Sequence, residues 1–210
     1  LAAADRAIID HPHVDAEQAA WLTAQGVPWL TFTHRDDWPG APDWLVNLRP
    51  GLPPREASGR TRFLRGPAFA VLRDEFARPC ERPYRPPDEN PRLFVTFGGG
   101  DDFGAGEALL PALLAAFPGL SLDVVTTRAN SGLATLEKVQ GRHADRVVLH
   151  IGPECMQPVM CRAGAGLIAG GTTTYELASV GIPFLVVSLV ENQRAQAAAW
   201  ADLGAAVDIG

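Results

Sequence analysis

The feature that most constrains the fold is a regular alternation of short apolar runs with helix-like segments in the C-terminal part of the chain. The apolar runs lie at residues 92–97, 122–126, 146–150, 166–169 and 184–188. Helical patterns separate or follow them at residues 106–116, 132–139, 156–163, 173–180 and 192–203. Strands that alternate with helices form βαβ units and a parallel sheet. We therefore expect a doubly wound α/β domain, whose ligands bind at the carboxyl ends of the strands.

A shorter version of this pattern precedes that domain. Apolar runs predict strands at residues 7–10, 29–32 and 44–47, and a helical pattern occupies residues 14–25. Residues 77–91 are rich in proline and charge, a composition that cannot continue a helix or a central strand. The sequence therefore predicts two Rossmann-like α/β domains, at residues 1–76 and 92–210, joined by a proline-rich linker at 77–91.

Composition narrows the classes of partner. The chain has 210 residues, of which 47% are hydrophobic and 20% charged, as expected of a globular protein. Its net charge is −6 and the basic residues are scattered, which argues against a nucleic-acid partner. No apolar run reaches the ~20 residues needed to cross a bilayer, so we expect no stable membrane insertion. Nothing in the sequence sets the oligomeric state.

The cysteines give an indication of the cellular compartment. The three cysteines, Cys80, Cys155 and Cys161, form an odd set and lack the C-x-x-C spacing of a metal site. A reducing cytoplasm is the simplest account of such a set. We therefore expect a cytoplasmic location.

The segment Ile168 to Leu177 is the strongest local signal, because an apolar strand is followed by two glycines, three hydroxyl residues and a helix. Gly170 and Gly171 let the backbone approach a phosphate, and the amides of Thr172 and Thr173 would point outward. Glu176 could accept hydrogen bonds from ribose hydroxyls. The same pattern also forms an ordinary strand-to-helix turn with an N-cap, so both interpretations stay open.

Two further segments repeat this logic at other strand ends. Gly98 and Gly99 follow a buried strand and predict either a close ligand approach or a flexible turn. The sequence lacks the third-glycine spacing and the P-loop lysine, which excludes the dinucleotide and ATP fingerprints. Glu191, Asn192 and Gln193 open the last helix and suit the hydroxyls or phosphate of a ligand, although a solvated N-cap explains them equally.

Histidines and acids in other loops are weaker signals. His11, His13 and His34 follow strands of the first domain and are candidates for catalysis, or are structural or surface groups. The acidic pairs at residues 36–37 and 101–102 are adjacent, and neighbours on an extended chain point apart. We therefore predict no metal site.

Several of these motifs occur together in one order. They are LRGPAFAVLRDEF at 64–76, FGGGD at 97–101, GGTTTYEL at 170–177, GIP at 181–183 and ENQ at 191–193. In this order they resemble the UDP-sugar hydrolases of the pseudaminic-acid pathway and the related spore-coat-polysaccharide proteins. Both are distant relatives of the peptidoglycan N-acetylglucosaminyltransferase that makes lipid II. The resemblance covers nearly the whole chain, including Ile9-Asp10-His11.

The resemblance implies a GT-B architecture, in which two Rossmann-like domains face a cleft and the C-terminal one holds UDP. Residues 171–173 would then cradle the diphosphate and Glu176 would hold the ribose. Ile151 and Met156 would border the uracil, and residues 192–193 would lie beside the diphosphate or the sugar. In the hydrolases, water attacks the anomeric carbon and UDP leaves, with its developing charge stabilised at the helix N-terminus. No metal or other cofactor is implied.

The sequence also departs from this family. The family's general base is a histidine in a glycine-rich loop near the start of the N-terminal domain, and no such stretch occurs here. We therefore expect a chain truncated at both ends, with an incomplete N-terminal domain and the base upstream of Leu1. Asp10 and His11 are the remaining catalytic candidates. Pro12 replaces a tyrosine, and Thr33-His34 replaces an acidic pair, both on the side that faces the sugar.

Three functions compete. The first is a hydrolase that releases UDP from an amino-deoxy-sugar nucleotide in surface-glycan or nonulosonic-acid biosynthesis. The second is a GT-B glycosyltransferase that passes the sugar to an alcohol instead of water. The third is a non-catalytic UDP-sugar-binding module, with which the Pro12 and Thr33-His34 departures agree. In each case the partner is a UDP-sugar, and the chain by itself is expected to bind UDP without turnover.

Overall fold

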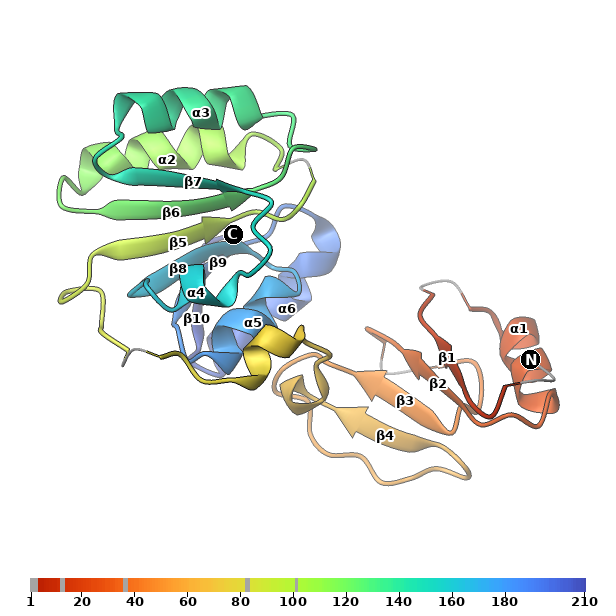
Figure 1. Cartoon of the computed structure of the whole chain (residues 1–210). Coiled ribbons are helices and arrows are strands. Elements are labelled where there is room, and N and C mark those ends of the chain that lie inside the picture. Colours follow the sequence, from red (N-terminus) through yellow and green to blue (C-terminus); the bar gives the residue numbers. More distant parts are fainter. Residues whose placement is uncertain (1–3, 12–13, 36–37, 82–83, 101) are drawn as a thin grey trace. The chain divides into compact units, whose positions relative to one another are not determined.

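The computed structural model describes residues 4–11, 14–35, 38–81, 84–100 and 102–210. The chain divides into two compact units, Leu1–Val71 and Leu72–Gly210. Each unit contains one sheet whose strands all run parallel (Figure 1). The α/β class with two parallel sheets is therefore confirmed.

The first unit has a four-stranded sheet in the order β1-β2-β3-β4. Its elements are β1 (Ala7–Ile9), α1 (Ala16–Ala24), β2 (Trp29–Phe32), β3 (Trp44–Asn47), β4 (Arg62–Arg65) and the 3₁₀ turn η1 (Pro67–Phe69). A capping box starts α1, because the Asp15 side chain accepts from the Gln18 amide and the Gln18 side chain accepts from the Asp15 amide. Trp29 is buried against Ala19 and Leu22. The strands expected at 29–32 and 44–47 are confirmed.

The second unit has a six-stranded sheet in the order β10-β9-β8-β5-β6-β7. Its strands are β5 (Arg92–Thr96), β6 (Ser121–Thr126), β7 (Val147–Ile151), β8 (Ala165–Ala169), β9 (Phe184–Val187) and β10 (Ala206–Asp208). Its helices are η2 (Asp74–Ala77), α2 (Ala105–Ala116), α3 (Leu133–Arg142), α4 (Gln157–Met160), α5 (Thr173–Ser179) and α6 (Glu191–Asp202). Because β8 returns to pair with β5, the strand order reverses between these two strands. This is the switch point at which open α/β sheets bind ligands.

The core of the second unit is continuous across the sheet. Leu93, Val95 and Leu122 from the central strands pack with Leu110 and Leu136 from α2 and α3. Over the described part of the chain, no helix combines the length and the apolar character that crossing a membrane requires.

The proline-rich segment is packed rather than free. The unit boundary falls after Val71, so the described residues of 72–91 belong to the second unit. The Tyr84 hydroxyl donates to the Gly164 carbonyl at 3.3 Å, and Asn90 Nδ2 donates to the Arg162 carbonyl at 2.8 Å. Proline prevents regular structure here, but it does not prevent the chain from packing on the turn between α4 and β8.

Cys80 and Cys161 form a disulfide, and Cys155 is free and exposed. The spacing of the cysteines in the sequence does not indicate this pairing. The partners are 81 residues apart, and their Cα atoms come within 5.6 Å only because the proline-rich segment packs on α4. Disulfide pairing depends on such tertiary proximity, which sequence spacing does not reveal.

A buried carboxylate joins neighbouring strands of the second sheet. The Asp123 side chain has no exposed surface and contacts Arg92 at 3.0 Å, His150 at 2.8 Å and Arg162 at 2.8 Å. These partners come from β5, β7 and the turn after α4, so a single acid ties four segments together. A cavity of about 500 Å³ opens beside this cluster and is lined by Arg85, Arg92 and Arg162 among others.

Candidate functional site

A cavity of about 250 Å³ lies at the carboxyl ends of β5, β6 and β7, beside the start of α5. Its lining includes five residues singled out in the sequence: Gly98, Gly99, Met156, Thr173 and Glu176. Its other lining residues are Arg73, Thr96, Val125, Thr126, Thr127, Gly152 and Pro153. The cavity therefore occupies the place where the doubly wound fold predicts a ligand.

The turn after β5 has the conformation that its glycines predict. Gly98 has a φ of +107°, which a residue with a side chain adopts only with strain, although a Cβ there would meet no neighbour. The Thr127 hydroxyl donates a hydrogen bond to the Gly99 carbonyl and so joins the ends of β5 and β6. The turn is thus shaped by backbone conformation and held by a neighbouring side chain.

The turn after β8 keeps half of its amides free. The Gly170 amide donates to the Val187 carbonyl at 3.2 Å, and the Gly171 amide donates to the Ala169 carbonyl at 2.8 Å. The amides of Thr172 and Thr173 donate no hydrogen bond to any residue that the structure describes. A phosphate at this turn would therefore meet two free amides rather than four.

Gln196 fixes this turn from α6, a role that the motifs do not reveal. Its Nε2 donates to the Gly171 carbonyl at 3.0 Å and to Thr174 Oγ1 at 2.8 Å. Gln193 lies one turn earlier on α6, and its Oε1 accepts from the Leu189 amide at 2.9 Å. Glutamines three residues apart share a helix face, and this spacing was the available signal.

Three predicted residues at the start of α6 lie outside the cavity. Glu191 is exposed and pairs with Arg194 at 2.9 Å, and Asn192 is also exposed. Gln193 packs on the turn, since a Cβ at Gly170 would lie 3.0 Å from Gln193 Cβ. Their contact with a ligand stays a prediction.

Glu176 is the buried acid of the cavity, with 7% of its surface exposed. Arg73 donates to Glu176 Oε1 through Nη2 at 3.0 Å and through Nε at 3.3 Å. Desolvation raises the pKa of Glu176, and the charge and hydrogen bonds of Arg73 oppose that rise. Glu176 Oε2 accepts no hydrogen bond from the described residues, so one carboxylate oxygen is available to a ligand.

Arg73 also holds a second acid. Its Nη1 lies 2.9 Å from Glu75 Oε1, and Glu75 Oε2 accepts from the Gln157 amide at 3.1 Å. Gln157 directly follows Met156, which lines the cavity. The motif at 64–76 therefore supplies a cation to the pocket, although its residues are far from α5 in the sequence.

Ile151 lies next to a cavity-lining residue, and the candidates Asp10 and His11 lie at the surface. Ile151 ends β7 and pairs in register with Thr126, and the two residues after it, Gly152 and Pro153, line the cavity. In the first unit, Asp10 and His11 follow β1 and are exposed. His13, Pro12, Asp101 and the pair at 36–37 lie outside the described residues.

Two parallel α/β units, the second with a cavity at the carboxyl ends of its strands, belong to a known class, because solved structures with a GT-B-like fold match this chain over nearly its whole length. No protein-family model matches the sequence. The chain is 28% identical over 159 residues to the spore coat polysaccharide biosynthesis protein SpsG of Bacillus subtilis, a match that covers 72% of this chain and 45% of that protein. The resemblance to the spore-coat-polysaccharide proteins is thus confirmed, and the chain spans about half the length of this relative.

Solved glycosyltransferases share the fold. MurG of Acinetobacter baumannii superposes with a TM-score of 0.62 at 19% identity, over 97% of this chain and 59% of that one. The glycotransferase of kitacinnamycin superposes with a TM-score of 0.58 at 18% identity, over 98% of this chain and 62% of that one. UGT2 of Phytolacca americana was solved with UDP-2fluoro-glucose and pterostilbene. It superposes with a TM-score of 0.57 at 15% identity, over 96% of this chain and 61% of that one.

Proposed function

We propose that the second unit binds the UDP part of a UDP-sugar, and that the protein releases UDP from an amino-deoxy-sugar nucleotide by hydrolysis. The observation that carries this proposal is Glu176, a buried carboxylate with one free oxygen, paired with Arg73 inside a cavity at the carboxyl ends of the strands. A carboxylate so placed suits two neighbouring ribose hydroxyls, which are donors that need a fixed acceptor. The complex of a structural relative, UGT2, with a UDP-sugar analogue supports the choice of ligand.

The cavity offers a distinct surface to each part of UDP. Met156 and Pro153 give an apolar wall for the base, and Glu176 lies on the side of α5 for the ribose. Thr173 lines the cavity and has a free amide, which suits the diphosphate. A volume of about 250 Å³ is small for a whole nucleotide sugar, so we place the sugar outside this cavity.

In the proposed reaction, the second unit holds the leaving group, UDP. Water attacks the anomeric carbon, the bond from that carbon to the diphosphate oxygen breaks, and UDP departs with additional negative charge. Free amides near the diphosphate stabilise that charge as it develops. Asp10 and His11 stay the candidates from this chain for activating the water.

Transfer to an alcohol is the second candidate function. The observation that favours it is the fold, because MurG and the two other structures above share it over nearly the whole chain. The leaving-group site would be the same for both reactions. Only the nucleophile differs between them.

Calorimetric titration with UDP, uridine and ADP tests the binding step. We expect UDP to bind. Uridine should bind more weakly, because it has no diphosphate to accept hydrogen bonds from the free amides at the start of α5. ADP should bind weakly, because a purine is larger than the uracil for which the site is proposed. Equal affinity for UDP and ADP would contradict the assignment. For the reaction, turnover of a UDP-linked amino sugar in ¹⁸O-labelled water separates the two functions, since hydrolysis labels the released sugar and transfer to an alcohol does not.

A further inference from the structure

We propose that the Cys80–Cys161 disulfide is a redox switch on the nucleotide cavity. In the oxidised state it holds residues 72–80, here named the strap, so that Arg73 stays on Glu176; reduction loosens the strap and weakens nucleotide binding. This inference rests on the proposed UDP site at Glu176. It adds a modification site and a mode of regulation to that function.

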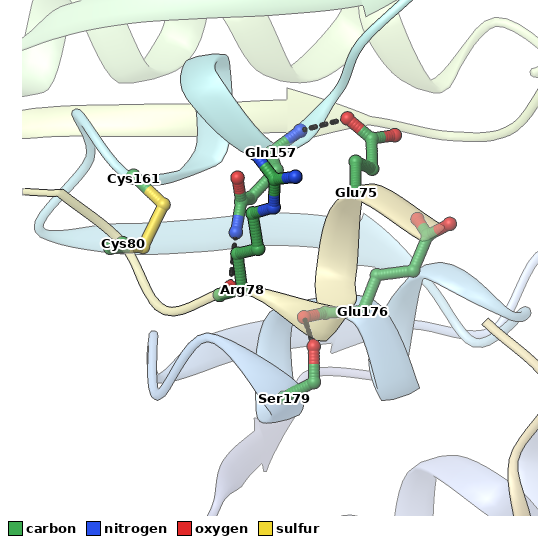
Figure 2. The surroundings of a disulfide bond; sticks show 7 residues. All are labelled: Glu75, Arg78, Cys80, Gln157, Cys161, Glu176 and Ser179. Atoms are coloured by element: carbon green, nitrogen blue, oxygen red, sulfur yellow. Dashed lines mark hydrogen bonds between the residues drawn. A yellow bond between two sulfur atoms is a disulfide. The ribbon is translucent and has the colours of Figure 1, made fainter. Parts of the chain in front are cut away.

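The strap is attached to the cavity walls at three points. Arg73 binds Glu176 of α5 at its start, and Cys80 bonds to Cys161 at its end. Between them, Gln157 donates through its amide to Glu75 and through Nε2 to the Arg78 carbonyl. Figure 2 shows the last two attachments side by side on α4, with Glu176 on the neighbouring helix. The strap therefore joins the two elements that carry the cavity residues Met156 and Glu176.

The covalent attachment matters because the others are weak in water. The Arg73 side chain is 45% exposed, and exposed ion pairs contribute little and are screened by salt. Phe76 is buried and remains an apolar anchor after reduction. We therefore expect the reduced strap to loosen and not to detach, so that the Arg73–Glu176 pair forms only part of the time.

Loss of this pair acts on the ligand through Glu176. Without Arg73 nearby, nothing opposes the desolvation that favours the protonated carboxyl. A neutral carboxyl accepts hydrogen bonds less well than a carboxylate. Ribose binding should therefore weaken when the strap is loose.

The chemistry of the switch balances with a dithiol as reductant. A thiolate of the dithiol attacks one sulfur of the Cys80–Cys161 bond, and its second thiol resolves the mixed disulfide. Two electrons and two protons pass to the protein, which gains two thiols, while the dithiol becomes a disulfide. A low-molecular-weight disulfide reverses the step by the same exchange.

The surroundings of Cys161 favour this exchange. Both cysteines are half-buried, and Cys161 lines the open cavity that also contains Arg92 and Arg162. Arg92 and Arg162 are paired with Asp123, so it is the access to Cys161 from this open cavity, and not a local positive charge, that favours the exchange. In a reducing compartment such a bond is transient and suited to sensing redox state.

The test compares the affinity of the oxidised protein for UDP with that of the same protein in excess dithiothreitol. Thiol counting in denaturant verifies the states, because Cys155 alone should react after oxidation and all three cysteines after reduction. We expect reduction to weaken UDP binding about three- to tenfold, the range that partial loss of an exposed ion pair allows. Near-ultraviolet circular dichroism in both states confirms that the fold is kept.

Variants separate the strap from other effects. C80S should bind UDP like the reduced protein in both conditions, and C155S should keep the full response. R73Q should bind weakly and lose the response to reduction. R78Q removes an arginine of the same strap whose side chain makes no hydrogen bond among the described residues, so it should behave like the native protein.

Three outcomes overturn the proposal, and a fourth concerns the proposed function. Equal UDP affinity in both redox states, or three reactive thiols after oxidation, would each exclude the switch. Absence of UDP binding in every state would instead remove the proposed function. Hydrogen exchange of residues 72–80 measures the mobility of the strap in the absence of UDP. We expect the exchange to become faster on reduction. Unchanged exchange would contradict the mechanism, whether or not UDP is the ligand.

Discussion

Arg73 and Glu176 are 103 residues apart, and two nitrogens of the Arg73 guanidinium donate hydrogen bonds to the same Glu176 oxygen, at 3.0 and 3.3 Å. This geometry orients the carboxylate while leaving Oε2 unused by the described residues. Glu176 is nearly buried, so the pair positions an acceptor inside a cavity where water competes poorly.

Replacement of Glu176 by alanine should weaken UDP binding by about 1–3 kcal/mol, because charge-assisted hydrogen bonds to the ribose are lost. Calorimetric titration measures this change directly. E137A is a matched control, since Glu137 is an exposed acid on α3, far from the cavity lining. An E176A protein that binds UDP as tightly as E137A would remove Glu176 from the site.

The affinity for UDP should also depend on pH through Glu176. Desolvation raises the pKa of Glu176, so binding is strongest above that raised pKa and is lost as the pH falls through it. The opposite sign applies to folding: the unfolding free energy falls as pH rises from the usual value of 4.5 through the raised pKa, because the folded state must ionise a buried acid.

R73Q should move the loss of binding to higher pH, since the main influence that lowers the pKa of Glu176 is removed. Titrations from neutral pH down to about pH 5 would show this displacement. The phosphate of UDP itself titrates at about pH 6, and this titration affects the binding of R73Q and R78Q equally. A difference between the pH profiles of the two variants therefore reports the protonation of Glu176. Superimposable profiles for these two variants would show that Arg73 does not control the carboxyl.

The sequence predicts the strands that carry an apolar run, including the edge strands β1 and β7, and misses the two edge strands that lack one. Apolar runs such as 29–32 and 184–188 lie between packed neighbours and read as continuous hydrophobic segments. The edge strands β4 and β10 were not predicted, because Arg62 and Arg65 are two of the four residues of β4 and exposed residues such as Val207 occupy β10. A strand with one neighbour needs no apolar run.

The candidate site also combines features that the sequence predicts with features that it does not. The glycine turns and Glu176 are local signals, because a strand, glycines and a helix follow each other in the sequence. The position of Arg73 beside Glu176 and the pairing of Cys80 with Cys161 depend on how a proline-rich segment packs on α4 and α5. No local pattern encodes contacts across 103 and 81 residues.

D123A should destabilise the second unit by about 2–4 kcal/mol, because it leaves Arg92, Arg162 and His150 without their shared acceptor. The estimate is below that for a fully enclosed pair, since the two arginine side chains are 33% and 44% exposed and can reach water. Thermal or urea denaturation measures the loss, and D145N, a change at an exposed acid, should leave stability unchanged. A near-native midpoint for D123A would mean that the cluster contributes little to folding.

Alanine at two adjacent glycines separates the two interpretations of the turn after β8. At Gly170, a Cβ would lie 3.0 Å from Gln193 Cβ and 3.3 Å from the Gln193 carbonyl oxygen, so G170A should force α6 away and destabilise the unit by about 1–3 kcal/mol. At Gly171, a Cβ would meet nothing within 4 Å and the backbone is not left-handed, so G171A should fold with native stability.

The difference between these variants lies in ligand binding. If the turn serves the close approach of a diphosphate, the new methyl group of G171A fills the space that the phosphate needs, and UDP affinity should fall about tenfold or more, a loss of about 1.4 kcal/mol. If the turn only starts α5, G171A should keep both its stability and any affinity for UDP. Denaturation and calorimetry on the same protein decide between these outcomes, because a glycine required for folding and a glycine required for phosphate contact change different measurements.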